Sequence, residues 1–154
     1  MQIIDSFRGE WGFLSNFHSA PVTLDSLTYP SAEAAFQAQK CASHAERVKY
    51  TAIRNPRIAK HTGRREALRE DWENFAPIAM ERVLRAKFRN KTLAARLLST
   101  KDALLIEGNR WHDNRWGHCT CENCREKPFE NRLGVLLMKI RAELDESLSG
   151  NTAL

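Results

Sequence analysis

The sequence predicts a helix-rich α+β fold, in one domain that includes a small antiparallel sheet. A two-residue turn signal, Asp25 followed by Ser26, lies between two short runs with strand character. After Pro30, apolar residues recur mainly at the three- and four-residue intervals of helices. The 154 residues show no repeat, linker or change of composition that would separate two domains. We therefore expect a single domain over residues 1–147 and a frayed tail at residues 148–154.

The expected strands are short and lie mainly near the N-terminus. Ile3, Ile4 and Phe7 look like one strand, and residues 22–24 and 27–29 form the two arms of a tight hairpin. Residues 9–17 combine Gly, Ser and Asn with three aromatic side chains in no regular period, which predicts a loop. Residues 104–107 are interpreted as a further short strand.

Helices are expected over most of the remaining chain. The first begins at Pro30 and Ser31 and runs through Lys40, because proline presets the backbone angle of a first turn and the serine hydroxyl accepts a hydrogen bond from a backbone amide there. A long helix that ends near Phe88 has Pro77 in or near its first turn. The other helical segments are residues 44–54, 55–63, 93–98 and a C-terminal helix from residue 133.

Charge and hydropathy restrict the function class. The net charge is +5, from 24 basic and 19 acidic residues, which suits anionic ligands such as nucleotides, sugar phosphates or nucleic acid. No apolar run approaches the roughly 20 residues that cross a bilayer. The first residues lack the basic start and long apolar segment of a signal peptide. We expect a cytoplasmic protein that does not bind a membrane.

The segment of residues 33–40 places an acid, an amide and an amine on one face of a helix. With about 100° per residue, positions i, i+3, i+4 and i+7 share a face. Glu33, Phe36, Gln37 and Lys40 occupy those positions, and the alanines between them leave room for close packing. Such a stripe is typical of a pocket wall. The alternative is a surface face with an incidental phenylalanine.

Two irregular segments carry further candidates. Residues 107–117 combine two tryptophans with His112 and Asp113, which suits a planar ligand held by stacking beside a carboxylate. The alternative is a tryptophan-anchored turn, and His112 is either an acid–base group or a structural residue. The loop of residues 11–17 contains Ser15, Asn16 and Phe17, whose side chains can donate or accept hydrogen bonds or face a base.

Three of the four cysteines, Cys119, Cys121 and Cys124, lie in one short segment. This spacing does not suit a disulfide framework. A zinc site needs four ligands, and the fourth would be His118, His112 or Cys41, none of them at a diagnostic spacing. We interpret the cysteines as free buried thiols, with zinc as the alternative, and expect no cofactor.

Five segments together resemble the NADAR (YbiA-like) domain family. They appear in the family's order and span residues 14–141, nearly the whole chain. The segments are LSNF at 14–17, YPSAEAAFQAQK at 29–40, APIAMERVLRAKF at 76–88, LLIEGNRWHDNRWG at 104–117 and NRLGVLLMKIR at 131–141.

The resemblance implies a compact, mainly helical α+β fold and an N-glycosidase activity without a cofactor. Members of the family act in two settings, which imply two candidate substrates. One is ADP-ribosylated guanine in DNA, RNA or a nucleotide, and the other is a ribosyl-phosphate intermediate of riboflavin synthesis. Residues implied to be catalytic are Glu33, Lys40 and Asp113. The resemblance also implies that Trp72 and Trp116 bind the substrate and that Ser15, Asn16 and Phe17 shape the pocket. We further expect Arg8 to hold phosphate, and Gln37 and Gly117 to belong to the substrate-binding residues.

Two departures from the family pattern concern substrate choice more than reaction type. Phe129 stands two residues before Asn131, where the family usually has glycine, and the cysteine segment replaces a short glycine-rich segment. We expect Glu33 and Lys40 to point into one cavity that faces the tryptophan–aspartate turn. Two alternatives are a non-catalytic ADP-ribose or nucleotide reader and a zinc-stabilised nucleic-acid binding module.

Overall fold

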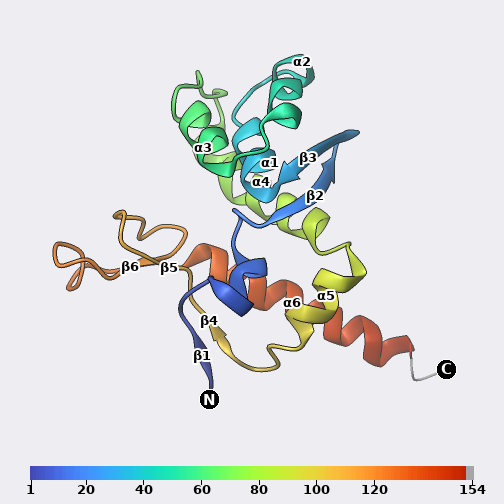
Figure 1. Cartoon of the computed structure of the whole chain (residues 1–154), viewed down its shortest axis with the longest axis vertical. Helices are drawn as coiled ribbons and strands as arrows, with labels where there is room; N and C mark the ends of the chain where they lie inside the picture. Colours follow the sequence, from blue (N-terminus) through green and yellow to red (C-terminus); the bar gives the residue numbers. More distant parts are fainter. Residues whose placement is uncertain (152–154) are drawn as a thin grey trace. The chain divides into compact units, whose positions relative to one another are not determined.

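The computed structural model describes residues 1–151 of the chain (Figure 1). These residues form two compact units. The first is built from Met1–Ser15 together with the chain from Lys91 onward, and the second is the continuous segment Asn16–Asn90. Helices dominate both units, and the strands form three two-stranded pairings, so the helix-rich α+β prediction is confirmed.

The second unit begins with the predicted hairpin. Strands β2 (Ser19–Leu24) and β3 (Leu27–Ser31) pair antiparallel, with Leu24 opposite Leu27. Asp25 and Ser26 have φ angles of 51° and 67°. Two successive left-handed residues make the kind of tight turn that matches the twist of hairpin strands. The turn signal in the sequence was therefore interpreted correctly.

Helix α1 (Ala32–Ala38) follows β3 directly and is buried along its whole length. The Ser31 hydroxyl accepts a hydrogen bond from the Ala34 amide at 3.1 Å, which confirms the predicted helix start. The helix ends earlier than expected, and the Lys40 amide donates to the Gln37 carbonyl in the turn that follows. The small side chains of α1 allow β3, α3 and α4 to pack closely around it (Figure 1).

The remaining elements of this unit follow the prediction with two differences. The stretch expected as one helix over residues 44–54 divides into α2 (His44–Arg47) and the 3-10 helix η2 (Val48–Ala52), before α3 (Pro56–Arg64). Helix α4 (Trp72–Lys87) begins earlier than its apolar periodicity indicates, so Pro77 stands in its second turn. Proline has no amide to donate to the carbonyl four residues before it, and that residue, Glu73, is exposed.

The first unit contains the other strands. β1 (Ile3–Ile4) pairs with β4 (Leu104–Leu105), and β5 (Gly108–Asn109) pairs with β6 (His118–Cys119). Both pairings are parallel, so among the residues described only the hairpin forms the antiparallel sheet that was expected. A two-residue turn must return the chain antiparallel, whereas these strands come from separated segments and have no such constraint.

Two helices and a 3-10 helix complete the first unit. Residues 9–14, expected as loop, form the 3-10 helix η1 (Gly9–Leu14), in which Phe13 and Leu14 are buried. Helix α5 (Lys91–Leu98) packs against α6 (Arg132–Asn151), which continues into the segment expected as a tail; residues 152–154 lie outside the described part. Neither these helices nor the others within residues 1–151 are long and apolar enough to cross a membrane.

Candidate functional site

The predicted stripe on α1 is buried rather than solvated. Glu33, Phe36 and Gln37 are only 6–7% exposed, and Lys40 is half-buried. The alternative of a surface face is therefore wrong. A carboxylate and an amide that are both buried beside an aromatic ring are uncommon, because polar groups inside a protein need partners to offset their desolvation.

Glu33 is held at both its backbone and its side chain. Its amide donates to the Asn16 carbonyl at 2.9 Å, and one carboxylate oxygen accepts from the Gln37 side-chain amide at 2.9 Å. The side-chain oxygens of Asn16 and Gln37 are both buried and accept no hydrogen bond within the described part of the chain. Buried acceptors without a donor are rare in proteins. The neighbourhood of Glu33 is therefore rich in hydrogen-bond acceptors.

Lys40 lies just past the end of α1, where the turn directs its side chain toward α3. Its ammonium nitrogen donates to the Gly63 carbonyl at 3.2 Å and lies 5.9 Å from the centre of the Trp72 ring. Burial lowers the pKa of Lys40, the Glu33 carboxylate opposes that shift, and Arg64 adds to it. A lysine with a lowered pKa is more readily neutral, and only the neutral amine is a nucleophile.

Trp72, the first residue of α4, connects this group to an aromatic cluster. It is buried, and its ring packs on Phe36 at a centroid distance of 5.4 Å and on Phe75 at 6.5 Å. The structure thus brings Trp72 together with Lys40 and Phe36, as its assignment to the site requires. Phe17 is partly exposed, and the Lys60 ammonium lies 5.9 Å from its ring.

Gly63 was missed as a site residue by the sequence reasoning, which assigned it only to the end of a helix. A Cβ atom at this position would lie 1.8 Å from the Gln37 side-chain oxygen and 2.9 Å from the Gln37 Cβ. Helix α3 therefore approaches α1 at a distance that only glycine allows. A glycine inside a helical pattern was the available signal.

The Trp–Asp turn belongs to the first unit and is organised by Asp113 itself. One carboxylate oxygen, Oδ1, accepts from the Arg115 amide at 3.1 Å and from the Trp116 amide at 2.9 Å. The amide of Asp113 donates to the side chain of Asn109, which is buried. Trp116 is half-buried, and the Arg115 guanidinium lies 5.4 Å from its ring. Asp113 thus has a structural role, and its catalytic role stays a prediction.

Two residues that the sequence reasoning passed over hold this turn in place. The side chain of Asn109 also donates to the Asp113 carbonyl at 2.8 Å. Asn131, whose φ is 50°, accepts from the Glu107 amide at 3.0 Å and donates to the Leu105 carbonyl at 2.9 Å. Asparagine tolerates left-handed backbone, and its amide satisfies a donor and an acceptor at once.

The remaining predicted binding residues of the first unit are Gly117, Arg8 and Ser15. A Cβ at Gly117 would lie 1.9 Å from a carboxylate oxygen of Glu107, so this glycine permits the close pairing of β5 and β6. Arg8 is exposed and immediately precedes η1, whereas Ser15 is half-buried and its amide donates to the Gly12 carbonyl.

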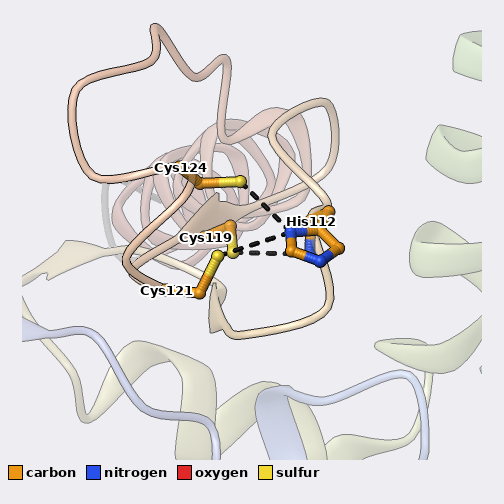
Figure 2. A group of neighbouring side chains, drawn as sticks. All are labelled: His112, Cys119, Cys121 and Cys124. Atoms are coloured by element: carbon orange, nitrogen blue, oxygen red, sulfur yellow. Dashed lines mark hydrogen bonds between the residues drawn. The ribbon is translucent and has the colours of Figure 1, made fainter.

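Four side chains in the first unit converge beside this turn. Ligand atoms of His112, Cys119, Cys121 and Cys124 all lie within 4.8 Å of one another (Figure 2). Cys41, in contrast, is buried in the second unit, where burial raises its pKa to about 11. Of the three candidate partners for the clustered cysteines, the structure therefore brings His112 to them.

Comparison with known proteins places these residues in a family context. Residues 6–145 match the family model of the NADAR domain. The chain is similar to the N-glycosidase YbiA of Escherichia coli K12, with 36% identity over 142 residues, covering 90% of this chain and 85% of that protein. It is 37% identical to the N-glycosidase YbiA of Shigella boydii over 142 residues, which again cover 90% of this chain and 85% of that protein.

A solved structure agrees with the fold. The NMR structure of Escherichia coli YbiA matches with a TM-score of 0.77 at 35% identity, covering 96% of this chain and 88% of that one. The chain is also 32% identical over 142 residues to a riboflavin biosynthesis protein of Vibrio vulnificus. That match covers 88% of this chain but 36% of the longer protein.

Proposed function

Because the chain belongs to the NADAR domain family and is a homologue of the N-glycosidase YbiA, we propose that it hydrolyses the N-glycosidic bond between a ribose carbon and a base or amine nitrogen. The observation that carries the proposal is the buried row of acid, amide and amine, Glu33, Gln37 and Lys40, beside Trp72.

Two chemical routes are open to these residues. On the direct route, water attacks the ribose C1 while the bond to nitrogen breaks, and the electron pair and a proton go to the leaving nitrogen. The Glu33 carboxylate would stabilise the positive charge that develops at C1 and accept the proton that the attacking water loses, and Lys40 in its ammonium form would supply a proton to the leaving nitrogen. Asp113 stays the second carboxyl candidate, and its position opposite Glu33 and Lys40 stays a prediction.

On the covalent route, Lys40 is the nucleophile. A ribose attached through an exocyclic amine opens to an imine at C1, and the neutral Lys40 amine adds there and gives up a proton to the Glu33 carboxylate. Glu33 passes this proton to the base amine, which leaves as the bond from C1 to its nitrogen breaks. Water then hydrolyses the lysine imine, which frees the amine and returns the ribose. The lowered pKa of Lys40 supports this route, because it increases the neutral fraction at a given pH.

For the substrate, we propose ADP-ribose attached to guanine, in nucleic acid or as a nucleotide. The net charge of +5 supports an anionic substrate, and the exposed Arg8 is proposed to contact phosphate. A second candidate is a ribosylaminopyrimidine phosphate. Its support is the similarity to the Vibrio vulnificus riboflavin biosynthesis protein.

Product analysis tests the activity and both substrates at once. The protein is incubated separately with an ADP-ribosylated guanine oligonucleotide and with a ribosylaminopyrimidine phosphate, and products are identified by mass spectrometry. Release of free base or amine and of the ribosyl product is expected from one of them. Tight binding without cleavage of either would replace the glycosidase proposal with a non-catalytic reader.

Two variants test the residues. Glu33→Gln is expected to lose most activity on either route, and the control Glu70→Gln changes an exposed carboxylate of the same unit. Full activity of Glu33→Gln would remove the main assignment. Borohydride added during turnover should attach the ribosyl mass to Lys40, and the Lys40→Ala protein should not be labelled. Exposed Lys91→Ala is the matched control, expected to be labelled as wild type.

A further inference from the structure

The cysteine segment and His112 form a cluster that the proposed glycosidase chemistry does not use. His112 lies in the turn after β5, and Cys119 is the last residue of β6. Because β5 and β6 are paired side by side, the loops that leave them run next to each other. Figure 2 shows the sulfurs of Cys119, Cys121 and Cys124 gathered on one side of the His112 ring.

We propose that this cluster binds one Zn²⁺ as a closed structural site. Its four ligands are His112, Cys119, Cys121 and Cys124. Each cysteine binds as a thiolate, so binding releases the thiol protons, and the histidine binds through a neutral ring nitrogen. With four protein ligands no position stays open for water, which distinguishes such a site from a catalytic zinc.

The spacing of the ligand atoms fits tetrahedral zinc. With Zn–S near 2.3 Å and Zn–N near 2.0–2.1 Å, a tetrahedron places sulfur about 3.6 Å from nitrogen and two sulfurs about 3.8 Å apart. The His112 Nδ1 atom lies 3.3 Å from the Cys124 sulfur and 3.4 Å from the Cys121 sulfur. All four ligand atoms are within 4.8 Å of one another. The distances between the ligand atoms therefore need to change by only a few tenths of an ångström to match a tetrahedral zinc site.

The surrounding backbone supports thiolate ligands. The His112 amide donates to the Cys119 sulfur at 3.3 Å, a bond of the kind that stabilises a metal-bound thiolate. His112 has a φ of 69°, a left-handed conformation that is costly for a residue with a side chain. That conformation presents its ring to the sulfurs. A strained backbone conformation persists only where surrounding interactions hold it in place, and coordination of the metal would be such an interaction.

The chemistry of the ligands selects the metal. Three thiolates and one imidazole in tetrahedral arrangement favour zinc over magnesium, calcium or manganese, which prefer oxygen ligands. All three cysteines are free thiols in the structure. A disulfide would join only two of the cysteines and would not explain why the third cysteine and His112 converge on the same point. A metal ion bound by all four side chains explains it.

The site would fix the turn that carries Asp113. Asp113 follows a ligand directly in the chain, and the Cys119 amide donates to the Asn114 side chain at 2.8 Å. The metal would therefore cross-link the two loops on either side of residues 113–117. If the proposed glycosidase function is also right, removing the zinc should reduce turnover, but metal binding itself does not depend on that function.

The test is metal binding by untagged protein purified under reducing conditions. Metal analysis by mass spectrometry should find about one zinc per chain. Chelated protein should take up Zn²⁺ again in competition with a chromophoric chelator. Co²⁺ added to the chelated protein should give the visible ligand-field bands of a tetrahedral site and a near-ultraviolet band from thiolate ligands. The cobalt spectrum uses the wild-type chain, so it stays informative where a variant fails to fold.

Variants identify the ligands. Cys119→Ser and Cys124→Ser should lower zinc affinity by at least a factor of ten to a hundred, and Cys41→Ser should keep wild-type metal content. Chelation should lower the unfolding temperature of the wild type more than that of Cys124→Ser, because the variant binds zinc more weakly. Three results would overturn the proposal: no uptake of Zn²⁺ by the reduced protein, a cobalt spectrum without thiolate bands, or wild-type zinc affinity of both variants in the competition with the chelator.

Discussion

Substitution of Gly63 by alanine tests whether the contact between α3 and α1 is as close as the structure shows. The new Cβ would lie 1.8 Å from the Gln37 side-chain oxygen, 2.5 Å from its Cδ and 2.9 Å from its Cβ. Rotation of the Gln37 side chain can relieve the first two contacts. It cannot move the Gln37 Cβ, so the helices themselves must separate.

The magnitude follows from two opposing effects. Overpacking of a core contact costs about 1–3 kcal/mol, whereas alanine in place of a helix-interior glycine stabilises by up to about 1 kcal/mol. The clash is the larger effect, so we expect the free energy of unfolding to fall by about 1–2 kcal/mol. For a chain of this size, that lowers the unfolding temperature by about 2–8 °C. Because Gln37 must move, its hydrogen bond to Glu33 should weaken and glycosidase turnover should fall as well.

The assay is thermal unfolding followed by circular dichroism. Gly150→Ala is the control, because a Cβ there meets nothing within 4 Å, and its unfolding temperature should equal or slightly exceed that of the wild type. In a Gln37→Ala background, Gly63→Ala should cost less, because two of the three close contacts are gone. A Gly63→Ala protein as stable as the wild type would refute the reasoning.

Two further predictions concern buried charge and the turn. Lys87 is 1% exposed, and burial lowers its pKa to about 7. The unfolded chain therefore binds more protons between about pH 7 and 10.5, so the free energy of unfolding should rise with pH across that window, by roughly 4–5 kcal/mol. Because the pKa of Lys40 is lowered as well, the test is a difference. In denaturant titrations, the free energy of unfolding of the wild type minus that of Lys87→Met should rise across this window, and a constant difference would contradict the prediction. Asp113→Asn keeps an oxygen acceptor for the Arg115 and Trp116 amides, so its stability should stay within about 0.5 kcal/mol of the wild type while Asp113→Ala loses about 1–2 kcal/mol. If the carboxylate takes part in the reaction, both variants lose turnover, whereas an Asp113→Asn enzyme with wild-type turnover would leave Asp113 a structural role only.

Local signals in the sequence predicted the parts of the fold that short-range interactions decide. The Asp25–Ser26 turn and the Ser31 cap depend on neighbours within a few residues, and both are confirmed. The stripe on α1 also formed as its spacing predicted, including the contact between Glu33 and Gln37. Lys40 differs, because the helix ends before it and a turn sets its direction.

The features that the sequence did not reveal depend on long-range contacts or on single backbone angles. Residues 9–14 have no helical period, and their 3-10 helix buries Phe13 and Leu14 in the first unit. The parallel pairings join β1 to β4 across about a hundred residues, a distance over which no sequence pattern specifies partners. The positive φ of His112 directs its side chain to the cysteines, and the residues next to it in the sequence do not predict this backbone angle.

The assembly of the first unit from both ends of the chain sets an order of events during synthesis. Residues 16–90 emerge from the ribosome as one contiguous piece and carry the hairpin, α1, α3 and α4. Strand β1 is translated before this segment, whereas its partner β4 and helix α6 are translated after it. Strand β1 must therefore stay unpaired until β4 has been synthesised. A chain truncated after about residue 90 would therefore contain every residue of the second unit but lack most of the first.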